Sequence, residues 1–206
     1  MICNQFQTCL ETTCIIERPA TTQKTNKKKK TRRPEKTESV FSEPACGSQE
    51  NQKKCIAFFD CRSQPSCTEK GKTYTLNASG QNLQVLCFHI DGGVVDSNVC
   101  NKCDYAFFLK DKASNGNGRA IFIELKGAHI RDAMKQLNDT LSLDTFKDIA
   151  KMYKKIYGRI VITSSVPRIR NDNQFMDLKE RFMDLGGNLK ISEINFVESY
   201  ADLDQF

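Results

Sequence analysis

The 206-residue chain lacks a long apolar run, a glycine-rich phosphate loop and an internal repeat. Because a membrane helix needs about 20 consecutive apolar residues, we expect no membrane-spanning segment. Residues 1–16 lack the charged start and apolar stretch of a secretory signal, so we expect a cytoplasmic or nuclear protein. The loop 115–118, Asn-Gly-Asn-Gly, has no Lys-Ser/Thr pair, so the sequence does not predict a nucleotide-hydrolysing P-loop.

Positive charge is concentrated in one segment of the chain. The net charge is +6, yet residues 17–37 hold nine Lys and Arg against two Glu, which leaves −1 for the remainder. Residues 17–45 also have few large apolar side chains, so we expect a disordered basic linker, either simply solvated or acting as a non-specific DNA tether. The expected organisation is a short Cys-containing segment 1–16, this linker, and an α/β domain 46–206 with its core at 83–197.

The order of strands and helices predicts an α/β fold with a central mixed sheet flanked by helices. Apolar runs of strand length occupy the ranges 83–90, 104–110, 120–126, 159–163 and 189–197. Apolar residues at helical spacing predict helices over the ranges 130–141, 144–157 and 175–185, with Gly158 ending the second and Gly186-Gly187 ending the third. The turn-forming residues 114–118 predict a hairpin between the second and third strands.

Three charged residues occupy the ends of the two hairpin strands. Asp104 opens one strand, and the other closes in Glu124-Leu125-Lys126-Gly127. Residues two apart in a strand share a face, so Glu124 and Lys126 point the same way and Asp104 can lie beside them. Neighbouring carboxylates repel unless a hard cation lies between them, which indicates Mg²⁺ or Mn²⁺. With a lysine present, this pattern favours phosphodiester hydrolysis over glycosidase chemistry, which gives no particular role to a lysine.

The acid-x-lysine triplet has little weight by itself, because Asp177-Leu178-Lys179 matches it equally well. That second triplet falls in a predicted helix, where residues two apart diverge by about 200° and cannot share a site. The strand leading into Glu124 and the Asp heading the preceding strand give the first triplet its weight. A surface salt bridge at the end of an amphipathic strand is the structural alternative.

These motifs resemble the PD-(D/E)xK nucleases, which have the restriction-endonuclease-like fold. The resemblance covers about residues 83–197 and implies a Mg²⁺-dependent nuclease acting on DNA ahead of RNA, in defence, restriction or repair. It gives Asp104 and Glu124, with the main-chain carbonyl of Leu125, the role of metal ligands, and it gives Lys126 a role beside the attacking water. It also implies a homodimer or a member of a larger complex.

Two further residue assignments suggested by the family resemblance leave alternatives open. Gln136 takes the place of a glutamine found in some branches, or is a polar residue flanking the apolar stripe of its helix. The family often has an additional acid before the first strand, for which Glu69 and Asp91 are the candidates. His129 is interpreted as a polar helix start rather than as a general base.

The ten cysteines offer a different class of function. Cys100 and Cys103, with Cys87 and His89 on one face of a strand, could converge on zinc. A second set is Cys46, Cys55, Cys61 and Cys67, whereas buried reduced thiols are the structural alternative. A zinc-stabilised, non-catalytic nucleic-acid-binding or interaction module is therefore the competing hypothesis. A cysteine-based enzyme ranks last because no Cys-His pairing is evident.

A row of lysines in the predicted second helix could contact phosphates or simply be solvated. Its members are Lys147, Lys151, Lys154 and Lys155.

Overall fold

The computed structural model describes residues 55–95, 100–111, 118–127, 129–163, 169 and 172–205. The predicted segment 1–16, the predicted linker 17–45 and Cys46 lie outside these residues. Within them, no helix is both long and apolar enough to cross a membrane.

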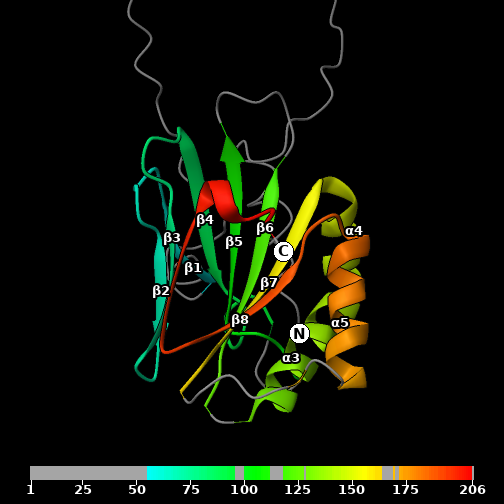
Figure 1. Cartoon of the computed structure of the whole chain (residues 1–206). Coiled ribbons are helices and arrows are strands. Elements are labelled where there is room, and N and C mark those ends of the chain that lie inside the picture. Colours follow the sequence, from blue (N-terminus) through cyan, green and yellow to red (C-terminus); the bar gives the residue numbers. More distant parts are fainter. Residues whose placement is uncertain are drawn as a thin grey trace, which may run out of the picture.

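A six-stranded mixed sheet forms the centre of the molecule, in the order β1-β4-β5-β6-β7-β8 (Figure 1). Its strands are β1 (Ile56–Asp60), β4 (Leu83–His89), β5 (Tyr105–Asp111), β6 (Arg119–Leu125), β7 (Lys155–Ile162) and β8 (Leu189–Glu193). Strands β4, β5 and β6 pair antiparallel, which confirms the predicted hairpin, and β7 and β8 continue the sheet parallel to β6. The predicted α/β class and mixed sheet are therefore correct.

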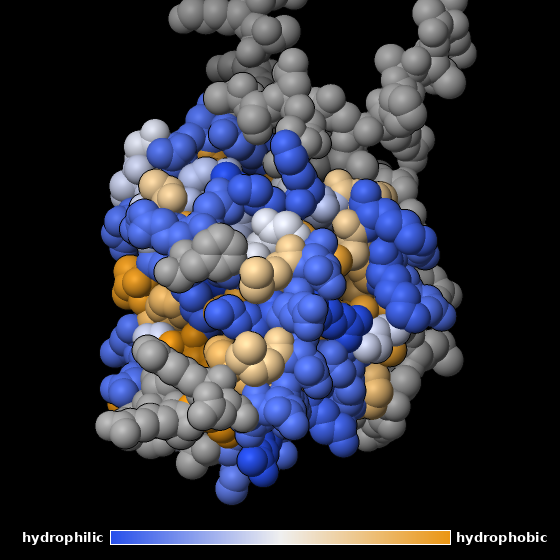
Figure 2. All heavy atoms as spheres, turned by 45° about the vertical axis from the view of Figure 1, so that its right-hand side comes forward, coloured by the Kyte–Doolittle hydropathy of each residue, from blue (hydrophilic) through white to orange (hydrophobic). Residues whose placement is uncertain are grey.

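Helices cover one face of this sheet (Figure 1). They are α3 (Ile130–Ser142), α4 (Asp144–Met152) and α5 (Asn173–Asp184). The apolar positions of α3 recur at helical spacing and are buried against the sheet, as the sequence predicted. Figure 2 shows this side with hydrophilic side chains over much of its surface and smaller apolar patches between them.

A second sheet, which the sequence did not predict, covers the opposite face. It contains β2 (Ser66–Glu69), β3 (Lys72–Asn77) and β9 (Asn195–Ser199) in the order β2-β3-β9, followed by the short 3₁₀ helix η1 (Tyr200–Asp202). Only its strand β9 overlaps a predicted strand. Strand β3 buries alternate residues, including Tyr74 and Leu76. Within the described residues, helices therefore flank one face of the main sheet and the second sheet covers the other, with a core on each side of the main sheet.

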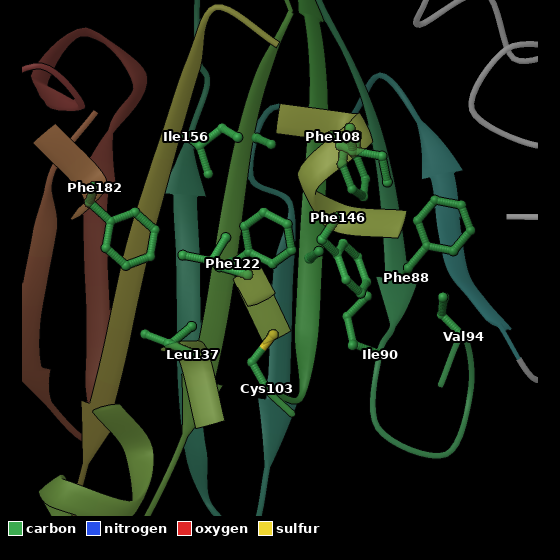
Figure 3. Close-up of a cluster of buried hydrophobic side chains, with 14 of the residues drawn as sticks. Phe88, Ile90, Val94, Cys103, Phe108, Phe122, Leu137, Phe146, Ile156 and Phe182 are labelled. Atoms are coloured by element: carbon green, nitrogen blue, oxygen red, sulfur yellow. The ribbon is translucent and has the colours of Figure 1, made fainter. Parts of the chain in front are cut away.

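Aromatic side chains fill the core between the main sheet and the helices (Figure 3). Phe88, Phe108, Phe122 and Phe146 form a chain of edge-to-face contacts with ring centroids 5.7, 6.2 and 5.4 Å apart. Each such contact stabilises the fold by about 0.5–1.5 kcal/mol beyond the burial of its surface. This core joins β4, β5 and β6 to α4 and so fixes the strand ends that carry the predicted acids.

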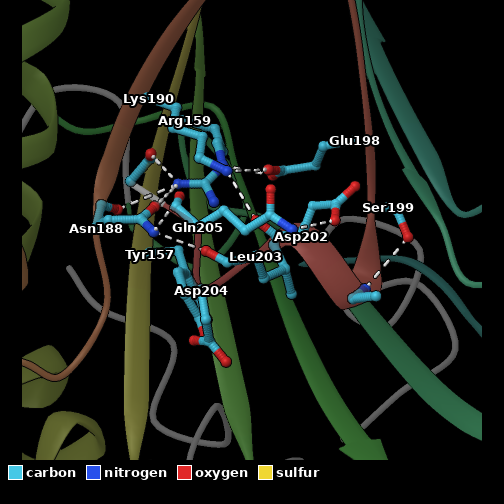
Figure 4. A network of polar contacts seen from close by, with 12 residues as sticks. Tyr157, Arg159, Asn188, Lys190, Glu198, Ser199, Asp202, Leu203, Asp204 and Gln205 are labelled. Atoms are coloured by element: carbon cyan, nitrogen blue, oxygen red, sulfur yellow. Dashed lines mark hydrogen bonds and ion pairs between the residues drawn. The ribbon is translucent and has the colours of Figure 1, made fainter.

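A buried polar network joins the main sheet to the second sheet (Figure 4). Arg159 on β7 is fully buried and forms an ion pair with Glu198 on β9. Glu198 also accepts a hydrogen bond from the Tyr74 hydroxyl at 2.7 Å, and Lys190 lies 3.4 Å from its other oxygen. Asn188 accepts from Arg159 Nη1 at 2.9 Å. The network gives the buried Arg159 and Glu198 charges opposite partners and ties the second sheet to β7.

The predicted helix 144–157 is wrong in its second half. Helix α4 ends at Met152, and β7 begins at Lys155. Gly158 is no helix stop; it lies inside β7, where a Cβ atom would stand 2.4 Å from the ring of Phe182. Tyr153 and Ile156 fit helical spacing, but the run from Ile156 to Ile162 is buried as a strand.

The predicted last strand 189–197 is two strands in two different sheets. Ile194, with φ of +20°, separates β8 from β9. This break lets β9 leave the main sheet and pair parallel with β3. Gly186 has φ of +74° directly after α5, as expected of a glycine at a helix end.

Candidate functional site

The site predicted from the hairpin strands lies at the start of β5 and the end of β6. Tyr105 pairs with Ile123 in the antiparallel ladder, so the next position brings Asp104 opposite Glu124. The main-chain N–H of Leu125 donates to Asp104 Oδ2 at 2.7 Å and fixes that carboxylate. The register of one hairpin therefore brings both predicted acids together.

Both carboxyl groups are in an environment that disfavours their charged forms. Glu124 is 1% exposed, and its Oε2 atom has no hydrogen-bond partner in the part of the chain that the structure describes. Burial, followed by the charge of Asp104, raises the pKa of Glu124 to about 9. Burial, with Glu69 nearby, raises the pKa of Asp104 to about 7 even though the Leu125 N–H acts in the opposite direction. A positive charge placed between the two groups would relieve both effects.

Lys126 and Gln136 also meet, although they come from different elements. Lys126 follows β6, and its N–H donates to the carbonyl of Val161 at 2.9 Å, so the backbone direction of the strand is retained. Its ammonium donates to Gln136 Oε1 on α3 at 2.6 Å. Gln136 Nε2 in turn donates to the carbonyl of Lys102 at 3.0 Å. Gln136 is thus oriented at one end by the chain before β5 and holds the lysine at the other.

Both candidates for an additional acid lie near Asp104. Asp91 forms an ion pair of 3.4 Å with Lys102, whose side chain is only 2% exposed. Glu69 stands at the end of β2, and among the neighbouring acids it contributes most to raising the pKa of Asp104, ahead of Asp91. Glu69 is therefore the candidate that acts more strongly on Asp104, and it comes from a strand of the second sheet rather than from a helix.

The donor set fits a hard divalent cation. A buried carboxyl, Glu124, lies opposite a partly buried one, Asp104, and one Glu124 oxygen has no partner within the described residues. Oxygen ligands of this kind suit Mg²⁺ or Mn²⁺. Among the described residues, no group of three or more His, Cys, Asp or Glu side chains is arranged to hold a metal. Asp104 and Glu124 would therefore be completed by main-chain carbonyl and water oxygens.

The cysteines and His89 do not converge as a zinc site would require. Cys87 packs in the core facing the second sheet, and His89 stacks on Tyr105 on the same side. Cys103 points into the opposite core, against the helices (Figure 3). Cys100 packs against the same core. The two pairs lie on different faces of the main sheet, so the four-ligand alternative does not hold.

The second cysteine set is dispersed as well. Cys55 packs in the helical core, Cys67 in the core facing the second sheet, and Cys61 is exposed. Cys61 and Cys67 are free thiols, as are Cys87, Cys100 and Cys103. Burial raises the pKa of the Cys67 thiol, which makes it a poor nucleophile.

The predicted row of lysines does not form one helical face. Lys147 and Lys151 lie on α4 and pair with Asp144 and Asp148, each at 2.8 Å. Lys155 belongs to β7 and pairs with Asp204 at 2.8 Å.

The other residues singled out in the sequence have ordinary structural positions. His129 precedes α3 and makes no side-chain capping hydrogen bond. The second triplet, Asp177-Leu178-Lys179, lies on α5 with Leu178 buried, as its apolar spacing predicted.

Sequence reasoning missed Lys70 and the buried Lys102 near these carboxylates. Lys102 lies between Cys100 and Cys103, a spacing that drew attention to the cysteines instead. Lys70 follows Glu69 in a region for which no strand was predicted.

Comparisons of the chain with protein-family models, with curated proteins and with solved structures give no match.

Proposed function

We propose that this protein is a metal-dependent nuclease that hydrolyses phosphodiester bonds, with DNA as the preferred substrate and a fold of the restriction-endonuclease-like type. One observation carries the proposal above the others. The carboxyl of Glu124 is buried, has an oxygen without a partner, and faces the carboxyl of Asp104. A pair of this kind lowers the stability of a folded protein, so its presence indicates a functional role. Binding a cation is the role that suits two facing carboxyl groups.

In the proposed site Asp104, Glu124 and the Leu125 carbonyl hold Mg²⁺ or Mn²⁺. Such a cation polarises a phosphoryl oxygen and makes a bound water more acidic. Lys126 places an ammonium next to the reacting phosphate, where it orients the attacking water or stabilises the negative charge that develops on the phosphoryl oxygens. Gln136 holds that ammonium in place through the 2.6 Å hydrogen bond. Asp104 is oriented for metal binding by the Leu125 N–H.

The choice of phosphodiester hydrolysis depends on the lysine. Two carboxylates alone would also suit other metal-assisted reactions. Lys126 is fixed by an uncharged partner, so its positive charge is not neutralised by that contact. An anionic substrate is therefore favoured. The choice of DNA rests on the order of Asp104, Glu124 and Lys126 along the hairpin, which is the order of the PD-(D/E)xK motif.

A substrate panel tests the proposal. Supercoiled plasmid, single-stranded DNA and RNA are each incubated with the protein in Mg²⁺, in Mn²⁺ and in EDTA. We expect metal-dependent cleavage of DNA, and we expect Lys126→Ala to lower kcat on the order of 10²–10³-fold. Lys179→Ala, in the helical triplet, is the matched control and should retain full activity. Metal-independent cleavage, or full activity of Lys126→Ala, would contradict the proposal.

A further inference from the structure

The turn between β2 and β3 has a backbone conformation that lysine rarely adopts. Glu69 pairs with Lys72 across the hairpin, so Lys70 and Gly71 form a two-residue loop. Both have positive φ, +47° for Lys70 and +76° for Gly71, as in a type I′ turn. Asn-Gly is the favoured pair in such a turn, because Asn tolerates the left-handed region better than most side chains do. Lysine at this position is unfavourable for the turn, so the stability of the turn does not explain why residue 70 is a lysine.

The hairpin is attached to the strand that carries the first catalytic acid. The Tyr105 hydroxyl donates to the carbonyl of Thr68 at 3.2 Å. One residue along on each side, Glu69 lies close enough to Asp104 for its charge to raise the pKa of that carboxyl. The tip of the hairpin, Lys70-Gly71, therefore begins next to the residue that acts on the proposed metal site.

The negative charges of the proposed metal site act on the Lys70 ammonium. Its hydrogen bond with Glu69 raises the pKa of Lys70, and the charges of Asp104 and Glu124 act in the same direction. The distance from Lys70 Nζ to Glu69 Oε1 is 3.1 Å. An exposed pair of this kind contributes little to stability and is easily exchanged for another anion.

Lys70 differs from the other lysines around the site in being open to solvent. Its side chain is 80% exposed. Lys72 and Lys102 are only 3% and 2% exposed, and their ammonium groups donate to the carbonyls of Lys70 and Cys100 at 3.0 Å each. Lys126 is held by Gln136. Of these four lysines, Lys70 is the most exposed, and it is not already assigned to the reacting phosphate as Lys126 is.

We propose that Lys70 binds a phosphate of the nucleic-acid strand next to the scissile phosphate, which makes the β2–β3 turn a substrate-binding element. This inference rests on the proposed function, because it assumes a polyanion at the metal site. Glu69 and Asp104 would repel such a substrate. The exposed Lys70 ammonium, paired with Glu69, offsets that repulsion where the strand must approach.

The test uses a substitution that suits the turn and removes only the charge. Lys70→Asn should fold as well as the native chain, with an unchanged or higher Tm, because Asn is preferred in this conformation. We expect its KM for a duplex oligonucleotide to rise roughly 3- to 10-fold with kcat nearly unchanged, and the salt dependence of log KM to become shallower by about 1. Lys70→Arg should restore the KM and the salt dependence.

Lys151→Gln is the matched control, since Lys151 is 76% exposed and pairs with Asp148 at 2.8 Å. It should leave KM and the salt dependence unchanged. Equal effects of Lys70→Asn and Lys151→Gln would overturn the inference, because they would show a general charge effect. Native KM and salt dependence in Lys70→Asn would overturn it as well.

Binding measured by fluorescence anisotropy in a Glu124→Gln background separates this inference from the proposed function. If the native protein cleaves DNA and Lys70→Asn has no effect on binding, the role of Lys70 is contradicted and the nuclease proposal is not. Binding that depends on Lys70 in a protein without metal-dependent cleavage supports the hairpin contact and contradicts the nuclease proposal. No binding and no cleavage would overturn both.

Discussion

The substitution Glu124→Gln should stabilise the protein while removing its proposed activity. Glu124 is buried, and its pKa is raised from 4.5 to about 9. In the folded protein at pH 7.5 this carboxyl is therefore protonated, whereas in the unfolded chain it is ionised. Folding must take up a proton, and the cost grows as the pH rises above 4.5. Gln has nearly the same shape, needs no proton, and keeps an oxygen that can accept a hydrogen bond.

The size of this effect follows from the pKa change. A pH of 7.5 lies three units above 4.5, the pKa of Glu124 in the unfolded chain. Protonating the carboxyl on folding costs about 1.36 kcal/mol per unit, so the free energy of unfolding of the native protein is lowered by up to about 4 kcal/mol. For a chain of this length that free energy corresponds to a rise in Tm of up to roughly 8 to 16 °C in Glu124→Gln. Stability of the native protein should fall between pH 4.5 and about 9, and the difference between native and variant should nearly vanish as the pH approaches 4.5.

Thermal and urea unfolding in EDTA, followed across this pH range, measures the effect. Adding Mg²⁺ or Mn²⁺ should raise the Tm of the native protein and leave that of Glu124→Gln almost unchanged, because a ligand stabilises only the state that binds it. Glu198→Gln is the matched control. Glu198 is also buried, at 7% exposure, but it is paired with Arg159, so its substitution should lower the Tm. If Glu124→Gln were less stable than the native protein in EDTA at pH 7.5, the electrostatic account of the site would be refuted.

Two further predictions concern positioning and packing. Gln136→Leu should lower kcat about 10- to 100-fold with little change in KM, because Lys126 loses the acceptor that orients it. Steady-state cleavage kinetics measure this effect. An unchanged kcat would mean that the hydrogen bond has no catalytic role. Gly158→Ala should lower the free energy of unfolding by about 1–3 kcal/mol, since its Cβ would stand 2.4 Å from the Phe182 ring. Urea titration checks that value against Gly127→Ala, where a Cβ meets nothing within 4 Å, and equal effects would contradict the packing argument.

The pair of acids could be predicted from sequence because it depends on local rules. The period of two in a strand places Glu124 and Lys126 on one face, and the hairpin turn brings Asp104 opposite Glu124. Helical spacing likewise placed Gln136 on α3. The hydrogen bond between Lys126 and Gln136 joins two consecutive elements, so it lies only ten residues apart in the chain.

The remaining parts of the site depend on contacts between distant segments. Strand β3 alternates Thr with Tyr74 and Leu76, and these two become a buried face only because the main sheet packs on them. The position of Glu69 beside Asp104 requires that hairpin to be docked, which local patterns do not reveal. The helix predicted through Tyr157 failed because Tyr153 and Ile156 have helical spacing, whereas β7 is buried on both faces from Ile156 onward and therefore shows no strand alternation; its pairing with β6 makes it a strand.

The most direct test of the account is the cleavage of supercoiled plasmid DNA by the native protein and by Glu124→Gln. Each protein is first freed of metal with EDTA, and excess Mg²⁺ or Mn²⁺ is then added while nicked and linear products are followed with time. We predict that cleavage begins only after the metal is added and only in the native protein, while Glu124→Gln remains folded with a higher Tm. Equal cleavage by both proteins, or cleavage that continues in EDTA, would contradict the claim that Asp104 and Glu124 form a catalytic metal site.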